Sequence, residues 1–209
     1  MSLSQQISHI PALMIRQRKE LAELIGFETR NKYEINAPDG RVLGFAAEQQ
    51  KGFLGAVMRQ FLGHWRTFEI LIFDAQRRPF LVARHPFRFI FQRLEILDAD
   101  SGRPIGALQQ RFSIIYKRFD VALPDGRVLM QVSSPFWRIW TFRFQGADGR
   151  ERAVITKKWS GALKEIFTDA DNFALEFTDP SLGDDERKLL LAAAIFIDLK
   201  YFEQKAQTN

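Results

Sequence analysis

The sequence predicts a mainly β protein, a closed twelve-stranded antiparallel barrel that encloses a hydrophobic C-terminal α-helix. Two observations predict it. Turn signals recur between strand-like runs along most of the chain, and one short, very apolar segment stands almost at the C-terminus. A closed barrel removes exposed sheet edges, and a lumen of twelve strands is too wide for wall side chains alone to fill. A helical plug is therefore expected inside it.

Six turn signals mark the predicted hairpins. Asp-Gly and Pro-containing dipeptides supply the backbone dihedrals that a tight reversal needs, and apolar, β-branched or aromatic runs flank each one. Six hairpins give twelve strands. The signals are Pro38-Asp39-Gly40, Gln76–Pro79, Asp100-Ser101-Gly102, Pro124-Asp125-Gly126, Ala147-Asp148-Gly149 and Thr168–Asp171.

The apolar segment near the C-terminus predicts the plug, a central helix over residues 186–203. Its uninterrupted apolar run, Leu189 to Ile197, is too short for a bilayer span, which needs roughly 20 residues. A helix that is apolar all round usually lies in a protein core. Asp198 follows this run, and a buried carboxylate is costly unless it is paired. It is either a polar anchor that sets the helix register or an exposed residue of the last turn.

The N-terminal segment, residues 1–25, has an amphipathic pattern that predicts a helix, with Pro11 at its start or at a kink. The barrel domain is expected over residues 26–203, followed by a short tail, 204–209. No secretory signal peptide is expected, because no apolar block of sufficient length precedes Arg16.

The charge of the chain is unevenly distributed. The net charge is +5, but residues 1–158 carry 25 basic and 15 acidic side chains, whereas residues 159–209 carry 5 and 10. A basic body suggests an anionic partner such as a lipid headgroup, a phosphoinositide or nucleic acid. The alternative is an ordinary basic, soluble surface. The chain has no Cys, which excludes disulfides, thiolate metal sites and S-acylation.

Two segments interrupt the hairpin pattern, Lys51–Arg66 and Arg84–Arg93. Both combine aromatic and aliphatic residues with Arg or Lys, a composition suited to lipid surfaces. We therefore predict a membrane-facing patch. Covering one barrel mouth or forming a dimer contact are the alternatives. The predicted contact residues are Phe53, Leu54, Phe61, Trp65, Phe87, Arg88, Phe89, Phe91 and Arg93.

Separated motifs resemble those of the phospholipid scramblases. They are GFETRNKYEINAPDGRVLGFAAE (residues 26–48), SGRPIGALQQR (101–111), KKWSGALKEIFTDADNFALEF (157–177) and the apolar helix ending in FIDLKYFE. The resemblance implies a barrel similar to tubby around a buried C-terminal helix. It also implies a peripheral membrane protein at the cytoplasmic, inner face of the plasma membrane. The family's long Pro-rich tail and Cys clusters are both missing from this chain.

The resemblance further implies calcium-dependent movement of phospholipids between leaflets, with calcium held by residues 169–180. Asp169 and Asp171 fit the first and third positions of a calcium loop, and Asp179 is a third candidate ligand. Ala174 stands where an EF-hand needs Gly, so an EF-hand is not expected. The alternative reading is an Asp-rich hairpin turn.

Other chemistries find little support in the sequence. The three His residues lack metal-ligand spacing, and neither a nucleotide-binding motif nor a nucleophile–base pair is evident. We expect no hydrolytic or redox enzyme and no organic cofactor. The basic, aromatic run Arg111–Arg118 fits either nucleic-acid contact or a strand with one wet face. A lipid- or phosphoinositide-binding barrel without transport activity, or a scaffold for protein or DNA, is the alternative function, and the oligomeric state is left open.

Overall fold

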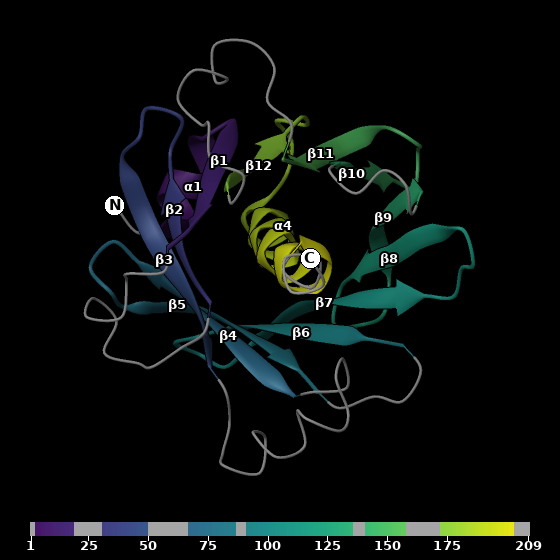
Figure 1. Ribbon diagram of the computed structural model, residues 1–209, viewed down its shortest axis with the longest axis horizontal. Helices are drawn as coiled ribbons and strands as arrows, with labels where there is room; N and C mark the ends of the chain where they lie inside the picture. The colour runs from purple at the N-terminus through teal and green to yellow at the C-terminus, as the bar shows by residue number, and fades with distance from the viewer. Residues whose placement is uncertain are drawn as a thin grey trace.

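The computed structural model describes residues 3–18, 31–49, 67–86, 91–135, 141–157 and 172–202, which form a closed β-barrel around a helix (Figure 1). The helices are α1 (Leu3–His9), α4 (Asp184–Ile197) and the π-helical turn η3 (Asp198–Phe202). The strands are β1 (Ala12–Gln17), β2 (Lys32–Asn36), β3 (Val42–Gln49), β4 (Phe68–Asp74), β5 (Pro79–His85), β6 (Arg93–Asp98), β7 (Pro104–Arg111), β8 (Tyr116–Ala122), β9 (Val128–Pro135), β10 (Thr141–Gly146), β11 (Glu151–Thr156) and β12 (Asn172–Phe177).

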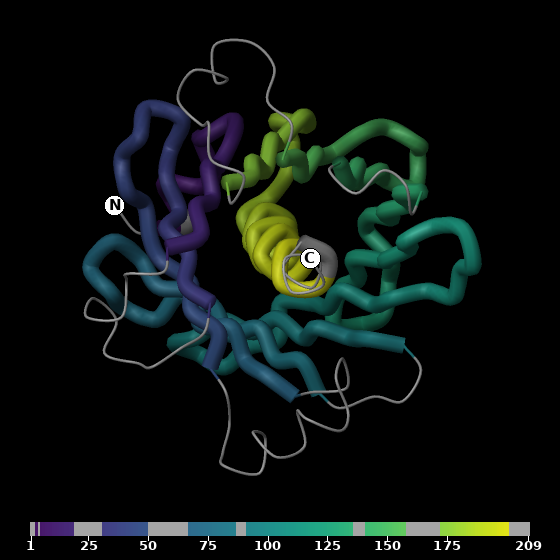
Figure 2. The backbone as a smooth tube through the Cα atoms, viewed as in Figure 1, coloured from purple at the N-terminus to yellow at the C-terminus, as the bar shows by residue number. Residues whose placement is uncertain are grey.

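The sheet closes because the first and last strands pair with each other. Every strand from β2 to β12 is the antiparallel neighbour of the next, and β1 lies between β12 and β2. Figure 2 shows the purple start of the chain beside the yellow-green segment that precedes the helix. The predicted fold class is confirmed, including the number of strands and the helix inside them.

Five of the six predicted turns join consecutive strands as tight hairpins, from β2–β3 through β10–β11. In each hairpin one residue of the second strand is skipped in the pairing just after the turn. Such bulges increase the local right-handed twist, which helps a sheet to curl into a barrel. Gly126 illustrates the turn chemistry, because its φ of 88° is one that Gly adopts without strain. The sixth signal, Thr168–Asp171, lies outside the described residues.

The predicted N-terminal helix over residues 1–25 is wrong for residues 12–17, which form a strand. Helix α1 ends at His9, and β1 then enters the barrel, so the predicted domain boundary at residue 26 is also wrong. The physical reason is that Ala12–Ile15 is a short, wholly apolar run, whose periodicity cannot distinguish strand from helix. The segment forms a strand because β12 and β2 pair with it on both sides and complete its backbone hydrogen bonds.

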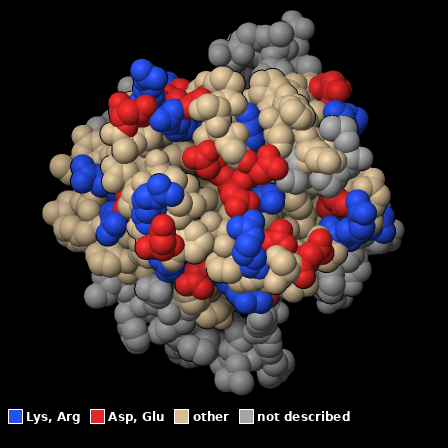
Figure 3. Space-filling model, turned by 180° about the vertical axis from the view of Figure 1, so that it is seen from behind, with Lys and Arg blue, Asp and Glu red and all other residues tan. Residues whose placement is uncertain are grey.

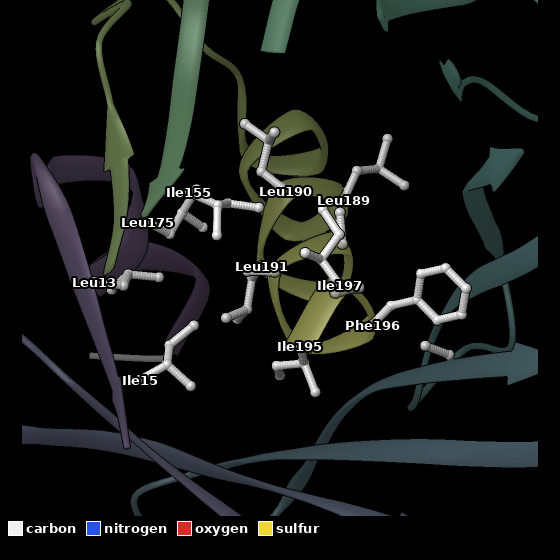
Figure 4. Packing of buried hydrophobic residues seen from close by; sticks show 14 of the residues in the cluster. Leu13, Ile15, Ile155, Leu175, Leu189, Leu190, Leu191, Ile195, Phe196 and Ile197 are labelled. Carbon is white, nitrogen blue, oxygen red and sulfur yellow. The ribbon is translucent and has the colours of Figure 1, made fainter. Parts of the chain in front are cut away.

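The predicted plug is confirmed: residues 187–197 of α4 are all buried. Figure 4 shows how its side chains meet the wall, with Leu191 on the side that faces Leu13 and Ile15 of β1. The described helix spans α4 and η3, 184–202, against the predicted 186–203. Gly106 in β7 leaves room for the plug, because an added Cβ would lie 3.1 Å from the Leu189 side chain of α4.

Candidate membrane-facing mouth of the barrel

The two ends of the barrel differ in composition. One end, the turn mouth, carries the five tight turns and the N-terminus of α4. At the other end, the C-terminal mouth, lie the last residues of β1, β3, β5, β7, β9 and β11, the first residues of their partners, and η3. Both aromatic-basic segments identified from the sequence connect strands at the C-terminal mouth, the first between β3 and β4 and the second between β5 and β6.

A buried ion pair fixes the end of the plug at the C-terminal mouth. The carboxylate of Asp198 lies 3.1 Å from the Lys157 ammonium and accepts a hydrogen bond of 2.9 Å from the Tyr33 hydroxyl. Asp198 is 1% exposed. The polar-anchor reading of Asp198 is therefore right, and its partners come from β2 and from the residue directly after β11.

Lys200 carries a second charge into this mouth. Its ammonium donates a 2.8 Å hydrogen bond to the Gln110 side-chain carbonyl and lies 5.6 Å from the ring centre of Phe119 and 5.7 Å from that of Phe196. Burial disfavours the charged form and lowers the pKa of Lys200 to about 8. At neutral pH Lys200 is still protonated in most molecules, so the mouth keeps this positive charge.

The two ends of the barrel also differ in their charged side chains. Among the described residues, the strand residues nearest the C-terminal mouth, their flanks and η3 include more basic than acidic side chains. The basic ones are Arg16, Arg18, Lys32, Arg84, Arg93, Arg111, Lys117, Arg118, Arg143, Lys157 and Lys200, and the acidic ones are Glu34, Glu48, Glu69, Glu95, Asp120 and Asp198. At the turn mouth α4 begins with Asp184, Asp185 and Glu186, which suit the positive end of the helix dipole. Figure 3 shows acidic and basic side chains intermixed over the face seen from behind Figure 1.

Exposed apolar side chains also concentrate at the C-terminal mouth. Phe91 is 38% exposed, Phe112 72%, Ile114 81% and Ile115 53%. Phe112, Ile114 and Ile115 belong to the run Arg111–Arg118 and were not among the predicted membrane-contact residues. Reading Arg111–Arg118 as one continuous strand was wrong, because β7 ends at Arg111 and β8 begins at Tyr116. Residues 112–115 carry no recognisable turn signal, because this hairpin connection contains no Gly, Asn or Asp.

The structure describes two of the nine predicted membrane-contact residues. Phe53, Leu54, Phe61, Trp65, Phe87, Arg88 and Phe89 lie outside the described residues. Of the set, Phe91 and Arg93 are described. Phe91 is partly exposed, as above, and the Arg93 guanidinium lies 3.0 Å from the Glu95 carboxylate. Both stand at the start of β6, beside the end of β7, so they border the β7–β8 connection.

Of the three predicted calcium ligands, Asp179 is the one that the structure describes. It lies two residues after the end of β12. Asp179 pairs with Arg152 and accepts hydrogen bonds of 2.6 and 2.8 Å from the Ser181 hydroxyl and amide. These bonds from Ser181, with Arg152, lower the pKa of Asp179 to about 2.

Two further findings concern only the part of the chain that the structure describes. Within it, three or more His, Asp or Glu side chains nowhere gather in a way that could hold a metal ion. Nor is any of its helices long and apolar enough to pass through a membrane. Asp169 and Asp171 are not among the described residues.

The family model described as Scramblase matches residues 2–204, nearly the whole chain. The chain belongs to the scramblase family. It is 30% identical to phospholipid scramblase 2 of Bos taurus over 95% of this chain and 71% of that protein. It is also 30% identical to human phospholipid scramblase 1, over 95% of this chain and 65% of that protein.

Two further proteins resemble this chain at lower sequence identity. Altered inheritance rate of mitochondria protein 25 of Saccharomyces cerevisiae is 23% identical over 98% of this chain and 74% of that protein. Among solved structures, a protein from Arabidopsis thaliana superposes with a TM-score of 0.50 at 12% identity, covering 90% of this chain and 93% of its own. At that identity the likeness concerns the fold alone.

Proposed function

We propose that this scramblase-family barrel binds anionic phospholipid membranes through its C-terminal mouth and moves phospholipids between leaflets while its plug stays in place. The observation that carries the proposal is the concentration of basic and exposed apolar side chains at that mouth, in a chain of this family. Juxtamembrane basic residues each gain about 1 kcal/mol near an anionic surface. We place it at the cytoplasmic face of the plasma membrane, the leaflet that carries anionic lipid.

Calcium is part of the proposal, with Asp169 and Asp171 as ligands and without Asp179. The engagement of Asp179 with Arg152 and Ser181 supports leaving Asp179 out of the ligand set. The missing ligands would come from backbone carbonyls, water or lipid phosphate, all of which suit calcium.

A second candidate is a lipid- or phosphoinositide-binding module without transport activity. The burial of residues 187–197 of the plug favours it, because a barrel filled by this helix offers lipids no path through its interior. Both candidates predict salt-sensitive binding to anionic vesicles. They differ in whether lipid moves.

The test measures lipid movement and vesicle binding on the same sample. The purified chain is reconstituted with liposomes that contain a fluorescent phospholipid, and the fraction accessible to an external quencher is followed with and without calcium. We expect calcium-stimulated movement that Asp169→Asn/Asp171→Asn abolishes and that Asp179→Asn, the matched control, retains.

Other outcomes separate the candidates. Flotation with the liposomes without lipid movement would leave the binding module as the function. Movement in which Asp179→Asn is as damaging as the double variant would refute the proposed calcium ligands. Neither flotation nor movement would refute both candidates.

A further inference from the structure

The connection between β7 and β8 has an unusual composition for a hairpin tip. Its residues 112–115 include Phe112, Ile114 and Ile115, which are 53–81% exposed. Hairpin connections normally use Gly, Asn, Asp or Ser, as the five turns at the turn mouth largely do. Besides these three, the large apolar side chains exposed among the described residues are Phe91 and Val42, each 38% exposed.

Strand pairing at the base of the hairpin and a hydrogen bond within the tip keep the tip ordered. Arg111 and Arg118 are paired at the base of the hairpin, and the Arg111 guanidinium lies 2.5 Å from the Asp120 carboxylate. Within the tip the Tyr116 amide donates a 3.1 Å hydrogen bond to the Ser113 hydroxyl. An ordered hairpin that presents several adjacent apolar side chains to water gains nothing from them within the molecule, and such patches mark interaction sites.

The surroundings of the tip identify the partner. The side chain of Arg111 is 57% exposed, Arg118 is exposed and lies 5.4 Å from the ring centre of Tyr116, and Phe91 and Arg93 start the neighbouring strand β6. Protruding apolar residues with arginines near their base match the two layers of an anionic bilayer, acyl chains beneath negative headgroups. Two Ile side chains cannot stack on bases, which argues against single-stranded nucleic acid.

We propose that the β7–β8 tip inserts Phe112, Ile114 and Ile115 into the headgroup–acyl boundary of an anionic membrane, with Phe91 entering beside them. The tip thereby orients the C-terminal mouth toward the bilayer. This inference rests on the proposed function only in that the chain binds phospholipid membranes. It requires no lipid transport and no calcium.

The absence of Cys from the chain makes a direct test simple. Single substitutions Phe112→Cys and Ile114→Cys are each labelled with an environment-sensitive fluorophore, and Val42→Cys serves as the matched control because Val42 is an exposed apolar residue beside a tight turn at the opposite mouth. On vesicles of phosphatidylserine and phosphatidylcholine, we expect a rise in emission and a blue shift at positions 112 and 114 and no change at 42.

A second measurement tests the contribution to binding. The triple variant Phe112→Ser/Ile114→Ser/Ile115→Ser should lower vesicle partitioning about tenfold or more, since buried CH₂ groups dominate such insertion. Val42→Ser should bind as the unchanged protein does. Circular dichroism on all variants should show the same melting, because the altered side chains are exposed.

The outcomes distinguish this inference from the proposed function. If the unchanged protein floats with vesicles but the fluorophores at 112 and 114 do not respond, the tip does not insert, and membrane binding uses another surface. If the fluorophores respond to raised protein concentration without vesicles, the tip contacts a second copy and the inference is wrong. If the protein binds no vesicles, the inference fails together with the proposed function.

Discussion

Replacing Arg187 with methionine is expected to lower the free energy of unfolding by about 3–5 kcal/mol. Arg187 is 4% exposed, and its guanidinium donates hydrogen bonds of 3.0, 2.9 and 3.2 Å to the carbonyls of Ile7, Ile10 and Leu182. It also lies 4.4 Å from the ring centre of Phe177. The side chain therefore ties α1 to the plug, and its loss removes three hydrogen bonds to main-chain carbonyls.

The matched control is Arg103→Met, at the same mouth. The Arg103 side chain is 54% exposed and pairs with Asp185 at 3.0 Å, a surface contact that contributes about 1 kcal/mol or less. Urea unfolding of both variants measures the difference. Equal losses would show that α1 does not depend on Arg187 for its attachment.

Asp198→Leu is the second change with a large expected effect, about 3–5 kcal/mol of destabilisation. It removes the carboxylate and leaves the Lys157 ammonium, whose side chain is 9% exposed, without this partner in a buried site. The Tyr33 hydroxyl loses its acceptor as well. Both consequences are local to the end of the plug.

A double-mutant cycle separates the missing charge partner from lost packing. Asp198→Leu/Lys157→Met replaces both charges by apolar groups, and such a replacement recovers much of the stability lost when one partner is removed. We therefore expect the double variant to be more stable than Asp198→Leu alone. A double variant that loses the sum of the two single effects would show that the ion pair does not couple the helix to the wall.

The fold could be predicted because its strongest determinants are local. A turn such as Asp125-Gly126 needs a backbone conformation that few residues adopt readily, so the sequence marks it directly, and Gly126 indeed has a positive φ. The plug was equally visible, since nine consecutive apolar residues fit few places in a protein of this size. Strand number and plug together determine the barrel.

The role of β1 could not be predicted in the same way. Ala12–Ile15 pairs with β12, which is far away in sequence, and no local pattern records a pairing of that range. The partner of Asp198 shows the same limit. A buried carboxylate predicts that a polar or basic partner exists, but only the closed barrel brings Lys157 beside it.

The structure locates part of the predicted membrane-contact set. Phe91 and Arg93, which the aromatic-basic composition indicated, lie at the C-terminal mouth, and their contact with a membrane stays a prediction. The tip residues Phe112 and Ile114 were taken for part of a strand, because β-branched and aromatic residues favour strands whether or not they are buried. A buried strand and an exposed hairpin tip differ in solvent exposure, which the composition of a segment does not record.

The central claim is that the barrel meets the membrane with its plug in place. Residues Leu189–Ile197 are each at most 2% exposed, and withdrawing their larger side chains would cost on the order of 10 kcal/mol, comparable to the stability of a whole domain. Hydrogen exchange of the vesicle-bound protein, read by mass spectrometry, tests this directly. We predict that amides of α4, β1 and β12 keep the protection they have in solution. Joint loss of protection in the helix and these strands on binding would contradict the account.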